Sequence, residues 1–263
     1  MSSSRFGRPY GSVDAIVNQP GILESRPGRN PQNPNAPYGL DYLTIVDQLL
    51  VKQKVELTEV LTGFETSNKY TILNASGQKV FYAVEDSDCC TRNCCATSRP
   101  FHLRILDNSP REIIHMHRPL ACSACCFPCC LQSIEVFAPP GNVIGTIEQE
   151  WSVGWPSFRI LNHLGEKVYR IEGPLCTCSL WGNVDFHVVS LTGAKVGRIS
   201  KQWSGLVREF FTDADFFGIS FPRELDVRMK AVLLGATFLI VSINVPPNDV
   251  VNPFCFFTGC HVL

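Results

Sequence analysis

Short apolar runs recur along most of this chain, and turn residues such as Gly, Asn, Asp and Pro separate them at close intervals. That pattern is typical of an all-β barrel or sandwich built from short strands. The start of the folded region differs, because its apolar positions have helical spacing: Leu40, Leu43, Val46, Leu49 and Leu50. We therefore expect a short helix that leads into a β domain.

The strand pattern also repeats itself. Three pairs of segments match: 104–120 with 159–175, 72–80 with 160–168, and 141–151 with 193–203. A single hairpin cannot bury an apolar face alone, whereas closing several hairpins around a common core also removes exposed strand edges. The repeats therefore predict one closed barrel built from duplicated hairpins.

The last apolar run has a different character. Residues 231–241 carry no strongly polar group, and Pro246 and Pro247 end the run. A membrane-spanning helix needs about 20 apolar residues, whereas a run of 10–14 is more often a buried core helix. A helix that is apolar on all sides must be buried in protein or in lipid. We expect a helix over 226–245, and its length favours a place inside the barrel over a bilayer span.

The N-terminal region has a separate composition. Residues 1–38 contain six prolines and no apolar periodicity, so we expect a disordered arm there. Two overlapping PxxP patterns at 31–37 fit SH3-type grooves, although a plain Pro-rich tail is the commoner meaning. The main domain is expected over 39–245 and a tail over 246–263. The net charge of −1 gives no global electrostatic reason to bind nucleic acid.

Thirteen cysteines gather in clusters, at 89–95, 122–130, 176–178 and 255–260. The N-terminus lacks the apolar core of a secretory signal, so we expect a reducing cytosol, where metal ligation or acylation is more common than disulfides. Cys122 and Cys125, and likewise Cys126 and Cys129, have zinc-ligand spacing, and Cys176 and Cys178 on the repeated module could complete a four-thiolate site. Zinc and acylation both remain open at this point, and for residues 89–95 nothing chooses between them.

Residues 213–224 have the acidic skeleton of a twelve-residue calcium loop. Asp213, Asp215 and Glu224 stand at positions 1, 3 and 12, with Gly218 at the position of the sharp turn. Phe217 and Phe221 occupy ligand positions without a side-chain oxygen, so an ion would depend on backbone carbonyls and water. Such a site binds weakly, at about 10⁻⁴–10⁻³ M. The alternative is an ordinary turn between two strands.

Several uncommon motifs, in order, resemble the phospholipid scramblase family from about Gly39 to Ile240. They are Leu61-Thr-Gly-Phe-Glu-Thr66, Asp88-Cys-Cys-Thr-Arg-Asn-Cys-Cys95, Ala138-Pro-Pro-Gly141, Gly197-Arg-Ile-Ser-Lys-Gln-Trp203 and Phe211-Thr-Asp-Ala-Asp215. The resemblance implies a mainly β fold, a tubby-like closed barrel of about 12 strands with internally duplicated hairpins around a hydrophobic C-terminal helix. It also implies a weak, activating calcium site, whose ligands would be Asp213, Asp215, Phe217, Ile219, Phe221 and Glu224.

The resemblance implies two further sites. The palmitoylated run of the family matches Cys125, Cys126, Cys129 and Cys130, with Phe127 where the family often has Cys. An unconventional nuclear import signal matches Gly197, Arg198, Ile199, Ser200, Lys201, Gln202, Trp203, Ser204, Gly205 and Leu206. The repeat copy at 145–151 keeps Gly, Ile and Trp but lacks the two bases, so the hairpin itself does not require them. After Ile240 the chain departs from the family, and Cys255 and Cys260 in that tail are either additional acylation sites or have no role.

The expected function is calcium-dependent, ATP-independent, bidirectional phospholipid scrambling at a membrane, with the plasma membrane reached from the cytosolic side. The sequence contains no Walker-type loop that would bind ATP, and no nucleophile–base arrangement that would indicate a conventional enzyme stands out. The alternative is a lipid-anchored adaptor or nuclear regulator, whose barrel binds lipids or partners. Its arm would bind SH3-type domains, its import signal would bind an importin, and acylation would divide it between membrane and nucleus.

Overall fold

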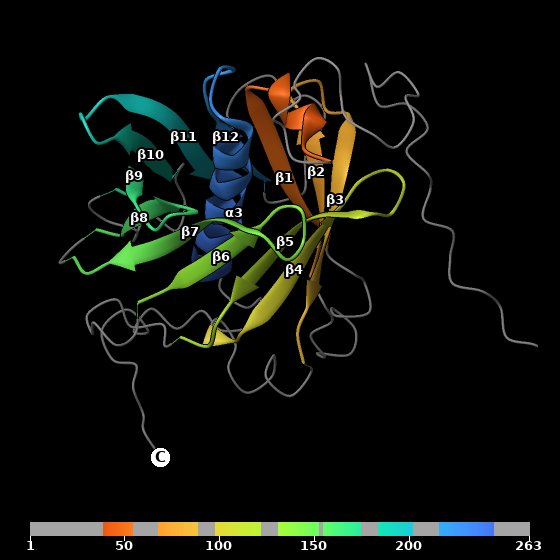
Figure 1. Cartoon of the computed structure of the whole chain (residues 1–263), viewed down its shortest axis with the longest axis horizontal. Coiled ribbons are helices and arrows are strands. Elements are labelled where there is room, and N and C mark those ends of the chain that lie inside the picture. Colours follow the sequence, from red (N-terminus) through yellow and green to blue (C-terminus); the bar gives the residue numbers. More distant parts are fainter. Residues whose placement is uncertain are drawn as a thin grey trace, which may run out of the picture.

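Twelve antiparallel strands form a closed barrel around one helix in the part of the chain that the structure describes (Figure 1). The structure is a computed structural model, and it describes residues 39–54, 68–88, 98–121, 131–152, 155–174, 184–201 and 216–244. The elements are η1 (Asp41–Thr44), β1 (Gln48–Lys54), β2 (Lys69–Asn74), β3 (Lys79–Asp86), β4 (Phe101–Leu106), β5 (Glu112–Arg118), β6 (Ser133–Phe137), β7 (Val143–Glu150), β8 (Ser157–Asn162), β9 (Lys167–Glu172), β10 (Asp185–Ser190), β11 (Lys195–Lys201), β12 (Phe216–Ser220) and the helix α3 (Val227–Asn244).

Each strand pairs with its neighbours in the chain, and β12 pairs with β1 to close the barrel. Residues that face inward alternate with exposed ones, as in β4, where Phe101, Leu103 and Ile105 are buried and His102 and Arg104 are exposed. Closure leaves no free sheet edge. The prediction of a closed barrel of about 12 strands around a C-terminal helix is therefore confirmed.

The sequence repeats correspond to repeated hairpin turns. In the β2–β3 turn, Oδ1 of Asn74 accepts hydrogen bonds from the backbone N–H groups of Ser76 and Gln78. Asn162 makes the same pair of bonds in the β8–β9 turn. Each turn then needs a glycine with positive φ, which is +76° at Gly77 and +77° at Gly165. The repeated Asn-x-x-Gly pattern thus specifies the same bend at equivalent places in the barrel.

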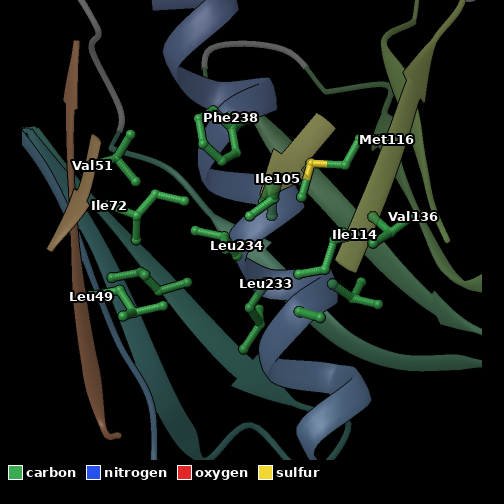
Figure 2. Close-up of a cluster of buried hydrophobic side chains, with 14 of the residues drawn as sticks. Leu49, Val51, Ile72, Ile105, Ile114, Met116, Val136, Leu233, Leu234 and Phe238 are labelled. Atoms are coloured by element: carbon green, nitrogen blue, oxygen red, sulfur yellow. The ribbon is translucent and has the colours of Figure 1, made fainter. Parts of the chain in front are cut away.

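The helix α3 fills the barrel. It runs lengthwise between the strands, with β6 to β9 on one side and β1 to β3 on the other (Figure 1). Figure 2 shows Leu233, Leu234 and Phe238 of α3 between side chains of β1 and β2 and side chains of β4 to β6. Residues 231–241 are all buried. A helix that is apolar on every side is stable here because the barrel wall surrounds it.

Two glycines let the helix approach the wall closely. A Cβ added to Gly235 of α3 would lie 2.7 Å from Cγ2 of Val136 on β6. A Cβ added to Gly145 of β7 would lie 2.8 Å from Cγ2 of Val232 and 2.6 Å from the carbonyl oxygen of Leu161. Neither contact leaves room for a side chain at the glycine. These positions fix where α3 sits against β6 and β7.

A buried lysine fixes the N-terminal end of α3. The side chain of Lys230 is fully buried, and its Nζ donates hydrogen bonds to the carbonyl oxygens of Leu43, Val46 and Arg223 at 2.7–2.8 Å. The ring of Phe221 lies 5.3 Å from the same ammonium. A buried ammonium loses its hydrating water, and here three carbonyl oxygens and the aromatic ring take the place of that water. Lys230 thus joins the helix to η1 and to the turn after β12.

The expected helix over residues 40–50 is wrong in extent. Only Asp41–Thr44 form a turn of 3₁₀ helix, and Leu49 and Leu50 lie on strand β1. Pairing with β2 and β12 overrides the helical spacing, because β1 closes the barrel. Residues 49–51 are all buried, which removes the alternation that would have marked the strand.

Candidate functional site

The barrel has two unlike ends. Tight turns join β2–β3, β4–β5, β6–β7, β8–β9 and β10–β11, so all five lie at one end, the hairpin end. The remaining connections between consecutive strands lie at the other end, which we call the connector end. Three of them, between β3 and β4, β5 and β6, and β9 and β10, contain cysteine clusters in sequence. The C-terminus of α3 also reaches this end, where Arg118 Nη1 donates to Ser242 Oγ at 3.4 Å.

A buried polar cluster lies at the connector end of the barrel. Arg99 donates to both carboxylate oxygens of Glu85, at 2.9 and 3.1 Å, and Asn68 and Ser87 donate to the same carboxylate. Burial alone would raise the pKa of Glu85, but Arg99 and the other donors lower it below its usual value. Glu85 is therefore charged at neutral pH even though it is buried.

Arg118 forms the second part of this cluster. Its guanidinium donates to Oε1 of Gln132 through two nitrogens and lies 5.5 Å from the ring of Phe101. Burial lowers the pKa of Arg118 to about 10. The side chain keeps its charge at neutral pH, so one buried cation, Arg118, lies where the helix ends.

Exposed aromatic residues mark the same end. Trp151 is 55% exposed and Trp155 is 44% exposed, and both lie in the connection between β7 and β8. Ser152 donates a hydrogen bond to the carbonyl oxygen of Trp155, which closes that connection on itself. Leu120, after β5, is 63% exposed. Trp and Leu side chains in such positions suit the interface between water and lipid.

Most of the described part of 213–224 is a strand, not a loop. Phe216–Ser220 form β12, which pairs with both β1 and β11, and Gly218 lies in mid-strand opposite Leu50. The expected sharp turn at Gly218 is therefore wrong. Phe217 and Ile219 point into the core, and the N–H of Phe221 donates to the carbonyl of Asp47 at 2.9 Å. Asp213 and Asp215 lie outside the described residues.

The strand separates the acidic positions. A five-residue strand spans about 13 Å from Phe216 to Ser220. Phe216, the first residue of β12, lies at the connector end, whereas Glu224 follows the strand in a turn at the hairpin end. Of the predicted carboxylates, Glu224 is the one within the described residues, and it lies at the opposite end of β12 from Phe216. A calcium site at Asp213, Asp215 and Glu224 stays a prediction.

The other predicted sites lie mainly outside the described residues. All thirteen cysteines do, including Cys125, Cys126, Cys129 and Cys130, and so does the N-terminal arm with its PxxP patterns. In the import segment, residues 197–201 lie on β11 between β10 and β12, and residues 202–206 are outside the described part. Ile199 is fully buried, and Arg198 forms an ion pair with Asp185 at 3.7 Å.

Three features of the folded barrel were missed from the sequence. Lys230, the Glu85–Arg99 pair and the meeting of His102 with His115 all depend on contacts between distant segments. A lysine beside an eleven-residue apolar run could have indicated the first, because a charge there needs a buried partner. The histidine contact needed the register of β4 on β5, which spacing alone does not give. Within the residues that the structure describes, no three metal-ligating side chains converge on one point.

The fold and the connector end define a β-barrel domain that is filled by its own C-terminal helix and has its long connections at one end. No helix among the described residues is long and apolar enough to cross a membrane. The scramblase family model matches residues 26–243. The chain belongs to the scramblase family.

Its relatives support this placement. Phospholipid scramblase 1 of Mus musculus is 56% identical over 233 residues, which cover 86% of this chain and 71% of that protein. Phospholipid scramblase 1 of Rattus norvegicus is 59% identical over 207 residues, which cover 78% and 62%. The chain thus spans roughly two thirds of the length of these relatives. A solved structure of an Arabidopsis thaliana protein covers 77% of this chain at 10% identity, with a TM-score of 0.42.

Proposed function

We propose that this protein moves phospholipids between the leaflets of a membrane, in both directions, without ATP and without a conventional catalytic site. The observation that carries the proposal is its 56–59% identity to phospholipid scramblases over 207–233 residues. Calcium is the trigger, and the plasma membrane, reached from the cytosolic side, is the site of action.

The connector end faces the membrane in this proposal. The connection between β5 and β6 contains Cys125, Cys126, Cys129 and Cys130, and stable anchoring needs two acyl chains or one chain with a second signal. Trp151 and Trp155 are exposed at that end and suit the lipid interface. Acylation is favoured over a zinc site because four thiols on one connection supply more chains than anchoring requires.

Calcium binds at the acids before β12 in this proposal. Asp213 and Asp215 precede β12 in the sequence, and β12 begins at the connector end. Phe217 and Ile219 lie on β12, which pairs with β1 on one side and with β11 on the other, so their backbone carbonyls lie within the sheet. Glu224 lies beyond the C-terminal end of β12. These three, with Phe221, join the ion only if β12 leaves the sheet. The resting site therefore consists of the two aspartates with water.

Reconstitution tests the activity and its trigger. Purified protein in liposomes should equilibrate a labelled phospholipid when calcium is added, and Asp213→Ala with Asp215→Ala should abolish the response. Glu166→Gln, an exposed acid in the β8–β9 turn, is the matched control and should behave as the wild type. Glu224→Gln should leave the calcium dependence unchanged. No lipid movement with calcium, or movement that ignores the aspartate changes, would refute the proposal.

A second candidate function has its own supporting observation. Because α3 fills the barrel, the interior offers lipid headgroups no space while the helix is seated. A lipid-anchored adaptor, with SH3-type partners on its arm and importin on residues 197–206, needs no such space. Changing Cys125, Cys126, Cys129 and Cys130 to Ala separates the two. Transfer of the variant to the nucleus with a retained regulatory output, and no scrambling by the wild type, would favour the adaptor.

A further inference from the structure

Three histidines meet on the outer face of the barrel. His102 of β4 lies directly opposite His117 of β5. His115, also on β5, is the diagonal neighbour of His102. The ring centroids of His115 and His117 lie 5.2 and 4.6 Å from that of His102. They are exposed or half-buried, and they lie on the opposite face of the sheet from the core that α3 fills. Nothing in the proposed lipid activity uses them.

Hydrogen bonding fixes the tautomer of one ring. Nδ1 of His115 lies 2.7 Å from Oε1 of Glu112. An ionised carboxylate can only accept, so Nδ1 carries the proton and donates it. In the neutral ring, Nε2 of His115 then has a free lone pair, and it faces Nδ1 of His102 at 3.0 Å. Two nitrogens of different strands are thus aimed at each other.

We propose that His102 and His115 bind a divalent transition metal ion, with Zn²⁺ as the ion of choice, between Nδ1 and Nε2. When His102 carries its proton on Nε2, neither of the two facing nitrogens is protonated, so both lone pairs are available to one ion. Two nitrogens of tetrahedral zinc, with bonds of 2.0–2.1 Å, stand about 3.3 Å apart. The two nitrogens therefore need to separate by a few tenths of an ångström, and both rings must tilt so that their lone pairs point to an ion beside the line that joins the nitrogens.

Glu112 completes the arrangement that is usual around zinc. Ligating histidines commonly donate their second N–H to a carboxylate, which orients the ring and raises its basicity. Glu112 already holds His115 in that way.

The surrounding charges suit a cation. Asp86 lies opposite His102 on β3, and Oε2 of Glu135 lies 3.6 Å from Nδ1 of His117. Arg104, opposite His115, acts against them. The ring of His117 stacks on His102 at 4.6 Å, so its nitrogens are beside the pair rather than aimed between them. Water fills the remaining coordination positions.

Imidazole ligands separate this site from the calcium proposal. Zinc, copper and nickel prefer imidazole nitrogen, whereas calcium takes oxygen ligands. The cysteines would also bind zinc, so the readout must report the histidines themselves. The full chain, labelled with ¹⁵N only in histidine, has six side chains to follow by long-range ¹H–¹⁵N correlation spectra during titration with Zn²⁺ alone.

The expected result is specific to one pair. Nδ1 of His102 and Nε2 of His115 shift together, while His163, exposed in the β8–β9 turn, does not. Either His102→Gln or His115→Gln removes the response of the other ring, and His163→Gln leaves it intact. Glu112→Gln keeps the pattern but weakens the apparent zinc affinity at least ten-fold. Circular dichroism verifies that each exposed-surface variant remains folded.

Two outcomes overturn the inference. In the first, zinc leaves the rings of His102 and His115 unchanged although it occupies thiols elsewhere. In the second, His115 responds equally with and without His102, which indicates independent surface histidines and a plain hydrogen bond between the rings. Neither outcome bears on lipid transport, because the titration contains no membrane.

Discussion

The seating of α3 in the barrel can be tested through Gly235 and Val136. Gly235→Ala places a methyl group 2.7 Å from Cγ2 of Val136, closer than carbon atoms pack. Overpacking of this size costs about 1–3 kcal/mol, and the better helix propensity of Ala returns about 1 kcal/mol. The single variant should therefore lose about 0–2 kcal/mol of unfolding free energy.

The double variant Gly235→Ala/Val136→Ala tests whether the two residues are in contact. Val136→Ala alone removes two buried methyl groups and should cost about 1–3 kcal/mol. In Gly235→Ala/Val136→Ala the new methyl group occupies part of the space that Val136 leaves. The double variant should therefore lose less unfolding free energy than the two single variants lose in sum, and the difference, the coupling energy, should be about 1–2 kcal/mol. The contact across helix and wall is the source of that coupling.

Urea unfolding, followed by circular dichroism, measures the four free energies of the cycle. Val80→Ala on β3 is the matched control, because Val80 is as buried as Val136 but contributes none of the atoms nearest to the added methyl group. Its coupling to Gly235→Ala should be near zero. A coupling below about 0.3 kcal/mol for the Val136 pair means that α3 does not pack against β6 in solution, and the reasoning fails.

Three further predictions concern the ends of the barrel. Lys230→Met should lower the unfolding free energy by about 2–4 kcal/mol, because three buried carbonyls lose a charged donor; urea unfolding measures this. Arg99→Ala should cost about 3 kcal/mol at pH 7 by leaving Glu85 buried and unpaired. The pKa of Glu85 is lowered in the fold, so its stabilisation is present above the unfolded value near 4.5 and disappears as pH falls through the lower folded pKa; the cost of Arg99→Ala should shrink in parallel. Trp151→Ala with Trp155→Ala should weaken vesicle binding in a flotation assay but leave unfolding in solution nearly unchanged.

The sequence was sufficient for the barrel because its information is local and repeated. Asn74 and Asn162 each specify a turn by bonds within four residues, so matching segments could be recognised as matching hairpins. The apolar run at 231–241 required a surrounding wall, and the strands were available to form it. Strand β1 was missed because both of its faces are covered near Leu49 and Leu50, which removes the alternation.

The site was predicted less well, because function depends on which segments meet. Glu85 and Arg99 are fourteen residues apart and pair only because β3 and β4 are neighbours. Likewise, the ring contact between His102 and His115 depends on the register of β4 on β5, which a bulge between Ile105 and Leu106 shifts by one residue. Spacing along the chain contains neither fact. The connector end, by contrast, follows directly once the strands are known to alternate in direction.

The energies of β12 decide how a calcium ion can act. Phe217, Ile219 and Phe221 are at most 4% exposed, and burial of each such side chain contributes about 1.5–3 kcal/mol. Detaching β12 therefore costs about 5–9 kcal/mol before any lost strand pairing is counted. A ligand at ten times its Kd supplies only about 1.4 kcal/mol. The weak calcium site that we propose cannot open the strand alone, so either the ion acts at Asp213 and Asp215 with the barrel closed, or lipid contacts at the connector end supply the difference.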